Sequence, residues 1–504
     1  MIRTQQDTSS PVRPNGGGQR AAQVGALVMA VLALSLLPIA YVYANTITVN
    51  STLTTIANDG KCTLIEAITS ANTDAVSGAM VGECTAGNGA DTIELQAFAF
   101  YELFSVNNST DGNNGLPSIT TQITINGNGA TIQRADLGCV LDVTTAVGEF
   151  RIIHVATSGD LKLNNITIRN GCADHPFNLA ALSGGGILNM GQLEITSSTL
   201  SNNAAEIGGS IRQLGGTLTI INSILSHNLA NNAGAVDIFS GTFMLISSTV
   251  SHNSAKSQVG AISLFTPAIA TVINSAISGN SAASVSGIDI RGTLTIINST
   301  IADNFGTNFG AITLEGGGTV NVKNSIVANN SPRNCQRFFP STFNAFGTNL
   351  DTDSTCSGFT LHTDPQLGPL QNNGDLTQTH ALLTGSPALD AAADCNDLSS
   401  NPVMTDQRGI ARPSGAQCDL GAYEATVLTV LGAGTGSGMV IDSGFNCTSS
   451  AGVMSGDCIE SVAGINTIVA LGVKPAAGSV FSDWNGNPDC ADGAVTMDTN
   501  VLRP

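Results

Sequence analysis

The sequence predicts an all-β chain built as a right-handed parallel β-helix, with three-stranded coils of about 25 residues and a small C-terminal β module. The first observation is a repeat: LTIINSILSHN at Leu218–Asn228 returns as FMLISSTVSHN at Phe243–Asn253 and as LTIINSTIADN at Leu294–Asn304. The second is its period, because the closing residues of successive repeats follow at intervals of 25, 25, 27, 24 and 26 residues after a first interval of 32. The third is composition: the chain has 56 glycines and only 11% charged residues, and the repeats show no helical periodicity.

Alignment on the closing residue predicts which side chains stack inside the coils. The columns ten and eight residues before it are apolar, and alternation along a strand puts both on one face. They contain Leu161, Leu193, Leu218, Phe243, Ala270, Leu294 and Val320, and Leu163, Ile195, Ile220, Leu245, Val272, Ile296 and Val322. Because one coil cannot bury that face alone, we expect the core to form by stacking. Two polar columns, beginning at Asn165 and at Ser198, are predicted to hydrogen-bond along the corners.

The N-terminal residues 1–44 are predicted to be a signal peptide. Arg3, Arg13 and Arg20 precede the apolar run 24–40, and small Ala44 follows it. An uncleaved membrane anchor is the alternative, since the run approaches the length of a membrane span. After cleavage no membrane span is expected, and the protein would be secreted or held at the cell surface.

Eleven cysteines favour an oxidising compartment. Proximity in the sequence predicts the disulfides Cys62–Cys84, Cys139–Cys172, Cys335–Cys356, Cys395–Cys418 and Cys447–Cys458, with Cys490 left over. Zinc is the competing interpretation, but the sequence has no CxxC and no histidine at ligand spacing. We therefore expect disulfides, no metal site and no cofactor.

The formal net charge of −19 argues against nucleic acid and anionic membranes as partners. Cations and neutral or basic ligands remain compatible with this charge. We expect a monomer whose partner is a polysaccharide or another surface protein.

Three segments resemble known families. DGKCTLIEAITSANTD at Asp59–Asp74 resembles the CSLREA motif of exported bacterial β-helix proteins, although Thr63 and Ile65 replace the Ser and Arg of that motif. The coils themselves resemble the pectin-lyase-like architecture. The resemblance implies an N-terminal cap over 45–115 ahead of the β-helix over 116–360, and within this cap the alternating TLIEAITSAN predicts a short amphipathic helix.

Residues 361–426 resemble the choice-of-anchor Q region. The match rests on TDPQLGPLQNNGDLTQTHALLTGSPALDAA, DQRGIARP and CDLGAYE. It implies a segment that closes the C-terminal end of the coils. Asp364, His380, Asp406 and Arg408 invite a catalytic interpretation, but the surrounding Gly, Pro and Asn favour a structural one.

Residues 427–504 resemble the divergent internalin-type repeat, through LTVLGAGTGSGMV and VKPAAGSVFSDWNG. The resemblance implies a small β module of the kind found on bacterial surfaces. A cysteine that would partner Cys490 is absent, so an incomplete module is the expectation.

Three outward features are candidate sites. Leu188, Arg212, Asp237, Ser263, Asp289 and Thr313 should align on successive coils, which makes Arg212, Asp237 and Asp289 candidate catalytic residues. The competing interpretation is a surface salt bridge beside a solvated aspartate. His227 and His252 share another position and could bind a metal or act as acid and base, or simply occupy an exposed turn.

The third feature is an outward isoleucine stripe of Ile221, Ile246, Ile273 and Ile297. An apolar stripe of this kind is typical of an interface, although the chain's own terminal segment could cover it. The sequence thus favours a binding or adhesion scaffold for polysaccharide or surface partners, with catalysis uncertain. The alternatives are a polysaccharide lyase or glycoside hydrolase and a purely structural envelope component.

Overall fold

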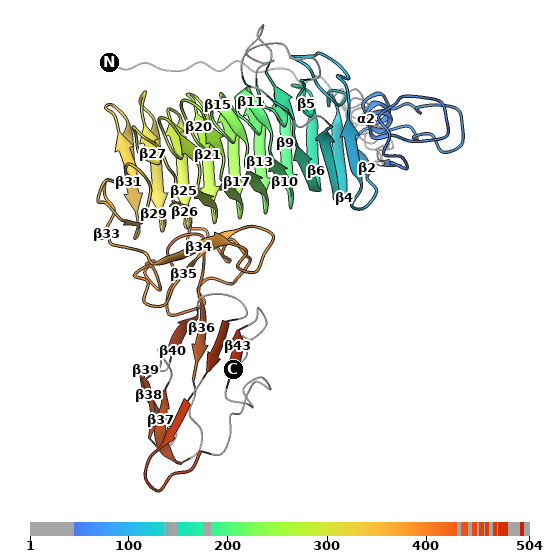
Figure 1. Ribbon diagram of the computed structural model, residues 1–504. Helices are drawn as coiled ribbons and strands as arrows, with labels where there is room; N and C mark the ends of the chain where they lie inside the picture. Colours follow the sequence, from blue (N-terminus) through green and yellow to red (C-terminus); the bar gives the residue numbers. More distant parts are fainter. Residues whose placement is uncertain are drawn as a thin grey trace, which may run out of the picture. The chain divides into compact units, whose positions relative to one another are not determined.

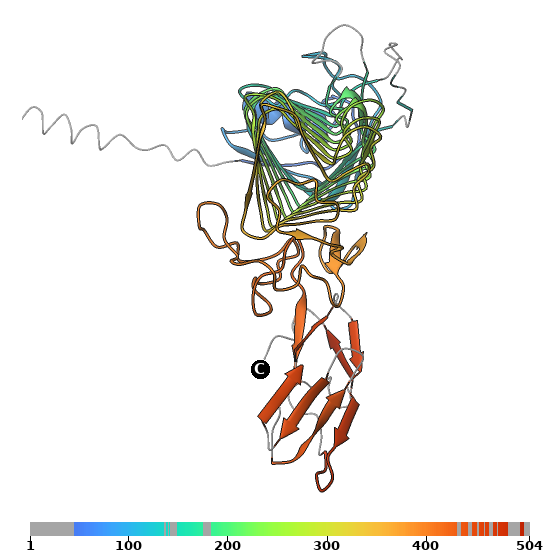
Figure 2. The ribbon, with the colours of Figure 1, turned by 90° about the vertical axis from the view of Figure 1, so that its left-hand side faces the viewer.

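A computed structural model describes residues 45–135, 138–139, 141, 149–174, 183–430, 435–441, 446–450, 453–457, 459–462, 467–470, 472–481 and 494–497. The chain coils into a right-handed parallel β-helix with three parallel sheets, followed by small antiparallel sheets (Figure 1). Seen along the axis, successive coils superimpose (Figure 2). The predicted fold class is confirmed.

The first sheet is twenty-stranded and receives two short strands from each complete coil. It contains β1 (Thr46–Thr48), β2 (Asp91–Glu94), β3 (Phe100–Leu103), β4 (Gln122–Arg134), β6 (Asp160–Arg169), β9 (Gln192–Thr196), β10 (Thr199–Ser201), β13 (Thr217–Ile221), β14 (Ile224–Ser226), β17 (Thr242–Ile246), β18 (Thr249–Ser251), β21 (Ile269–Ile273), β22 (Ala276–Ser278), β25 (Thr293–Ile297), β26 (Thr300–Ala302), β28 (Thr319–Lys323), β29 (Ile326–Ala328), β31 (Thr342–Phe346), β32 (Leu350–Asp351) and β33 (Leu361–His362). We call the run β9–β13–β17–β21–β25–β28–β31 the broad line and the run β10–β14–β18–β22–β26–β29–β32 the short line.

The other two parallel sheets complete each coil. The five-stranded sheet contains β7 (Cys172–Ala173), β11 (Ala204–Ile207), β15 (Leu229–Asn232), β19 (Ser254–Ala255) and β23 (Ser281–Ala282). The eight-stranded sheet contains β5 (Ile153–Val155), β8 (Ile187–Asn189), β12 (Ile211–Gln213), β16 (Val236–Ile238), β20 (Ile262–Leu264), β24 (Ile288–Ile290), β27 (Ile312–Leu314) and β30 (Cys335–Arg337).

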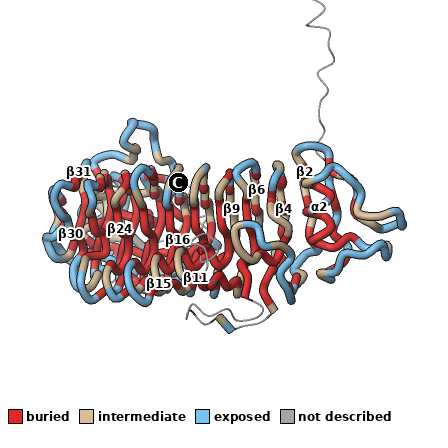
Figure 3. Tube along the Cα trace, turned by 90° about the horizontal axis from the view of Figure 1, so that it is seen from above, coloured by how far each residue is buried: buried red, intermediate tan, exposed pale blue. Residues whose placement is uncertain are grey.

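The predicted core columns are buried and in register. Leu218 pairs with Phe243 and Ile220 with Leu245, and every member of both columns is at most 2% exposed. Burial is continuous along the inside of the coils, while the turns are exposed (Figure 3). The prediction of the core is confirmed. In a solenoid, the alternation of side chains along each strand and the stacking of coils together determine which residues are buried.

Two ladders of polar side chains run along the corners. The serine column that begins at Ser198 is buried, and the Ser198 backbone N–H donates to Ser223 Oγ at 3.1 Å. The column that begins at Asn165 instead holds left-handed corner residues with φ of 45–51°. The second ladder consists of the closing residues Asn203, Asn228, Asn253, Asn280, Asn304 and Asn330, each donating from its amide to the next, as Asn228 Nδ2 does to Asn253 Oδ1 at 2.9 Å. The hydrogen-bonded ladder predicted for the Asn165 column was wrong. The side chains of these left-handed corner residues point outward, so they cannot stack inside the coils.

The N-terminal cap contains α2 (Leu64–Thr73), which the alternating TLIEAITSAN predicted. Thr63 and Glu66 form a capping box at its first turn, and Asp74 ends it in a left-handed conformation. Leu64, Ala67 and Ile68 are buried in the same core as the coils. Within the described residues, no helix is long and apolar enough to cross a membrane.

The last coil is closed by residues that follow β32. Cys356 bonds to Cys335, and Phe359 packs edge-on against Phe343 at a centroid distance of 6.0 Å. Residues 361–426 were expected to close this end; β33 does pair with the last strand β32 there, but the remainder of the segment contacts the side of the coils. Thr249 Oγ1 donates to the Gln378 carbonyl at 2.7 Å, and the Ala422 N–H donates to Thr300 Oγ1 at 3.0 Å. This segment, which we call the side segment, therefore covers the outward face of the short line.

The side segment holds the hairpin β34 (Leu367–Gln371) and β35 (Thr379–Leu382) and its own small core. Ala381, Leu420 and Tyr423 pack there against Ile326 and Leu350 of the short line. Beyond it lie the antiparallel strands β36 (Thr426–Thr429), β37 (Ser437–Ile441), β38 (Asn446–Ser450), β39 (Val453–Asp457), β40 (Ile459–Val462), β41 (Thr467–Ala470), β42 (Gly472–Pro475) and β43 (Ala494–Met497).

Four predicted disulfides are present: Cys62–Cys84, Cys139–Cys172, Cys335–Cys356 and Cys395–Cys418. Cys447 is also disulfide-bonded, while Cys458 and Cys490 lie outside the described residues, as does the predicted signal peptide. Several disulfides in one chain favour an extracellular setting.

Candidate functional site

A row of mostly polar side chains follows the outward side of the eight-stranded sheet. The central residue of each strand points away from the core, because its two neighbours point into it. Strand pairing aligns His154, Leu188, Arg212, Asp237, Ser263, Asp289, Thr313 and Gln336. This register is the one that the sequence predicted for Arg212, Asp237 and Asp289. We call these eight residues the polar row.

The polar row is buried, which the sequence analysis did not foresee. Arg212 is 7% exposed, Asp237 0% and Asp289 2%. A tight corner precedes these strands: a Cβ added to Gly209 or Gly234 would lie 2.4 or 2.3 Å from the carbonyl oxygen of the next coil. Only glycine fits where backbones approach this closely. The expected salt bridge between Arg212 and Asp237 is present, but it is buried rather than at the surface, and Asp289 is not solvated.

Each aspartate of the polar row has one arginine partner. Arg212 Nη1 lies 3.3 Å from Asp237 Oδ2, and Arg291 Nη2 lies 3.2 Å from Asp289 Oδ2. Burial raises the pKa of Asp237 to about 6, with Arg212 opposing the shift. Burial also raises the pKa of Asp289 to about 7; Arg291 opposes this, and the neighbouring Glu315 adds to it.

Neither carboxylate can contact a substrate in this arrangement. Both oxygens of Asp237 and Oδ1 of Asp289 are buried and accept no hydrogen bond among the described residues. A general acid or nucleophile must come within hydrogen-bond reach of the reacting group. The geometry therefore favours a structural role for this pair over catalysis.

We expect ionisation of Asp289 to lower the stability of the fold. Its pKa is about 7 in the folded chain against 3.8 for the free side chain, so the folded state binds more protons between these values. Stability should therefore be highest near pH 4 and fall as the pH rises through 7. Asp289→Asn should reduce this slope, of which the raised pKa of Asp237 leaves a part, and should raise the free energy of unfolding at pH 8 by about 1–3 kcal/mol. Denaturant unfolding at pH 4.5, 6 and 8 measures it.

The control for this experiment is Asp59→Asn in the exposed loop before α2. It should leave the pH dependence of the wild-type chain unchanged. Equal slopes for Asp289→Asn and wild type would contradict the assignment.

A second outward row borders the polar row, one position past each strand. It holds Leu214, Phe239, Phe265, Arg291, Glu315 and Phe338, joined coil to coil by backbone hydrogen bonds such as that of the Phe265 N–H to the Ile238 carbonyl. Phe239 is 49% exposed and Phe338 37%, and the Phe239 and Phe265 rings lie 6.0 Å apart. We call Phe239, Phe265 and Phe338 the aromatic row.

The arginines of this face lie against the aromatic row. The Arg212 guanidinium is 5.8 Å from the Phe239 ring centre and that of Arg291 is 5.0 Å from Phe265. Phe309 packs edge-on against Phe338 at 5.4 Å. The sequence analysis missed this row, although a Phe directly after the strand in VDIF, ISLF and CQRF is a visible signal.

The polar row begins beside a Ser–His–Asp group that the sequence analysis also missed. Ser118 Oγ lies 2.9 Å from His154 Nδ1, and Asp111 Oδ2 lies 3.5 Å from Nε2. Burial lowers the pKa of His154 to about 4, and the charge of Arg151 lowers it further. With 1% exposure, the imidazole of His154 is enclosed by the loop that carries Asp111 and Ser118, which favours a structural role.

His227 and His252 stack on neighbouring coils, with ring centroids 5.4 Å apart and planes inclined by 9°. Both are exposed, and Gly279 takes the next position. Burial and the neighbouring His227 lower the pKa of His252. Among the described residues, no third metal-ligating group joins them.

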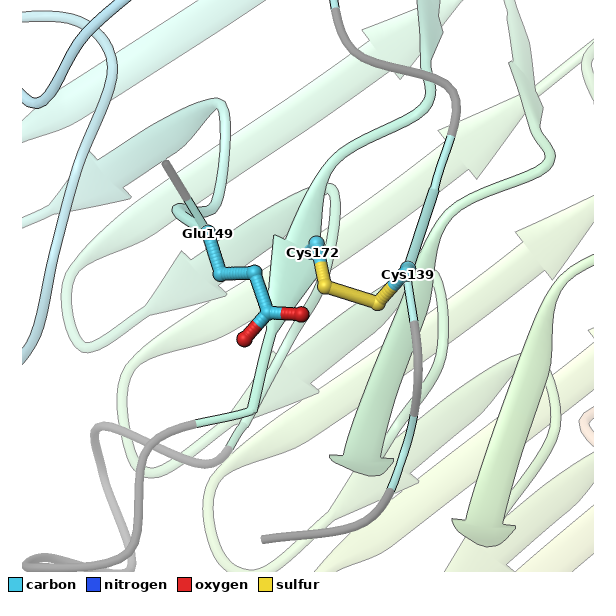
Figure 4. Close-up of side chains that lie close together, drawn as sticks. All are labelled: Cys139, Glu149 and Cys172. Atoms are coloured by element: carbon cyan, nitrogen blue, oxygen red, sulfur yellow. A yellow bond between two sulfur atoms is a disulfide. The ribbon is translucent and has the colours of Figure 1, made fainter. Parts of the chain in front are cut away.

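One described group of three potential metal ligands exists, at Cys139, Glu149 and Cys172 (Figure 4). The two sulfur atoms form a disulfide, so neither is a thiolate ligand. This group therefore consists of the Glu149 carboxylate beside the disulfide bond of Cys139 and Cys172.

The isoleucine stripe lies at the edge of the broad line. Ile221, Ile246 and Ile273 are partly exposed, whereas Ile297 is 3% exposed. The side segment reaches this corner, where Asn274 Nδ2 donates to the Thr405 carbonyl at 2.7 Å. Part of the stripe thus remains open to solvent among the described residues.

The polar residues of the side segment are structural. Asp406 and Arg408 form a buried ion pair, and His380 bonds to Ser278 and to the Gly368 carbonyl. Asp364 is exposed and accepts from the Gln366 N–H two residues on.

No family model matches the sequence, and no curated protein matches it significantly. Among solved structures, pectate lyase Pel9A is similar, with a TM-score of 0.41 and 14% identity over 76% of this chain and 97% of that chain. By its own strand topology the chain is a parallel β-helix with three parallel sheets. At this identity the likeness concerns the fold and says nothing about activity, and the three segment resemblances stay predictions.

Proposed function

We propose that this chain is an exported scaffold that binds a neutral polysaccharide along the aromatic row without cleaving it. The observation that carries the proposal is the placement of Phe239, Phe265 and Phe338 in one outward row. Phe239 and Phe265 are on adjacent coils and Phe338 is three coils further on. With about 4.8 Å per coil, the row spans about 19 Å, so a ligand that touches all of it must be extended.

The chemistry of the row suits sugars. Phenylalanine faces offer flat apolar surface to the C–H groups of sugar rings. Arg291 and Glu315 lie between Phe265 and Phe338, partly exposed, and can donate to and accept from hydroxyl groups. The net charge of −19 favours a neutral polymer over an acidic one.

Burial of the polar row supports binding rather than cleavage. A lyase or hydrolase using Arg212, Asp237 and Asp289 would have to bring these groups to the glycosidic bond, and their oxygens are covered. For an exported chain, polysaccharide binding would amount to adhesion to a cell surface or matrix.

The double variant Phe239→Ala/Phe265→Ala tests the proposal. We expect its affinity for the best ligand in a panel of neutral and acidic polysaccharides to fall about tenfold or more, because stacking surface is lost from two coils. Affinity electrophoresis followed by calorimetry measures it. The matched control is Phe305→Ala, which removes a 60% exposed ring elsewhere on the coils and should bind as wild type.

Two outcomes would count against the proposal. One is undiminished binding by the double variant. The other is accumulation of new chain ends in any polysaccharide incubated with the folded protein and Ca²⁺, which would favour the enzyme alternative.

A further inference from the structure

From β13 to β31 the outward face of the broad line carries two columns of uncharged side chains, most of them threonine; on β9 the same columns begin with Gln192 and Glu194. The columns are Thr217, Thr242, Ile269, Thr293, Thr319 and Thr342, and Thr219, Met244, Thr271, Thr295, Asn321 and Asn344. None of these residues is buried. We call this surface the threonine face.

The threonine face is periodic in two directions. The five strand pairings from β13 to β31 are in register at every residue and contain no bulge. Neighbouring positions are therefore about 4.8 Å apart between coils and about 6.8 Å apart along a strand. Threonine is β-branched and stiff at χ1, so the hydroxyl and methyl groups repeat with the backbone.

The chemistry of the face is uniform. From β13 to β31 no column member carries a charge, although the whole chain has a net charge of −19. Within the described residues, the hydroxyls of Thr219, Thr271 and Thr295 form no hydrogen bond, so they are free to bond outward. The preference of threonine for strands explains its presence here but not the lack of Lys or Glu on six consecutive coils.

We propose that the threonine face binds ice. A rigid array that repeats in two directions matches a ligand that repeats in two directions, and a neutral face suits an uncharged lattice. Ice also accepts and donates hydrogen bonds at every site, as a hydroxyl does. A protein partner would need no repeat, and a single polysaccharide chain repeats in one direction. Ile269 and Met244 interrupt the columns with uncharged apolar groups, which keep the face free of bound ions.

The experiment compares the full chain with Thr271→Lys, at the centre of the face. We expect the wild type to show thermal hysteresis and to inhibit ice recrystallisation, and we expect Thr271→Lys to lose both. A lysine there lifts the face off the lattice and adds a hydrated charge. The matched control is Asn308→Lys, which adds the same charge in an exposed loop and should retain the wild-type effect on ice.

Thermal unfolding checks that each variant is folded. We expect Thr271→Lys to fold because Thr271 is not buried. Absence of both effects from the folded wild type would overturn the proposal, as would their survival in Thr271→Lys. Adsorption to crystalline cellulose with no effect on ice would also overturn it. Polysaccharide binding through the aromatic row should be equal in wild type and Thr271→Lys, so the two proposals can fail separately.

Discussion

Arg408→Ala is expected to unfold the side segment locally, because the described partners of Arg408 all lie within that segment. Arg408 Nε and Nη2 donate to Asp406 Oδ2 at 2.9 and 2.6 Å, and its guanidinium stacks on Tyr423 at 3.5 Å. Its Nη2 also donates to the Glu424 carbonyl. Alanine would leave the carboxylate of Asp406, which is 0% exposed, with its backbone N–H donors but without its cationic partner, which costs about 3 kcal/mol. Thermal unfolding should show a lower first transition, and limited proteolysis should cut within residues 361–426.

The control for this substitution is Arg333→Ala, on an exposed turn where Arg333 bonds to Gln336. Its effect should stay within about 0.5 kcal/mol. If Arg408→Ala resists protease like the wild type, the buried ion pair is not what keeps the side segment folded.

The coils could be predicted in detail because a solenoid converts sequence spacing into position in space. Leu218 and Phe243 are 25 residues apart and pair on adjacent strands, so one period fixed the core and the register of Arg212, Asp237 and Asp289. Four of the five predicted disulfides are present, because these cysteines are near one another both in the sequence and in space.

Burial of an outward column could not be predicted in this way. Alternation assigns Arg212 and Asp237 to the outside, but it does not tell whether neighbouring side chains and turns cover them there, and both are buried. Alternation likewise does not distinguish a corner residue such as Asn222, with φ of 48°, from the ladder residue Asn228 six positions later.

The sequence analysis did not predict which surface of the coils the side segment contacts, because this segment has no repeat. Gln407 Nε2 donates to Thr249 Oγ1 across 158 residues of sequence, and Lys323 bonds to Asp394 across 71. No spacing argument reaches contacts of that range. Its composition predicted loops and a structural role, but not the surface that it covers.

Asn253→Leu is expected to break the closing ladder at its centre. Asn253 is 0% exposed; its Oδ1 accepts from the N–H and Nδ2 of Asn228, and its Nδ2 donates to the Leu225 carbonyl and to Asn280 Oδ1 at 2.9 Å. Leucine has a similar volume but no polar atom, so several buried groups lose their partner at once. Each such group costs about 1–3 kcal/mol, and we expect a total loss of about 3 kcal/mol by denaturant unfolding.

Which coils lose protection from hydrogen exchange is a sharper test of the ladder than the amount of stability lost. In a solenoid each coil contacts only its neighbours, so hydrogen exchange should rise at the coils of Asn228 and Asn280 and stay unchanged near Asn203 and Asn330. Asn308→Leu, on an exposed loop, should alter neither stability nor exchange. Uniform acceleration along all coils would mean that the ladder unfolds as one unit, and unchanged exchange beside position 253 would mean that backbone pairing alone holds the corner.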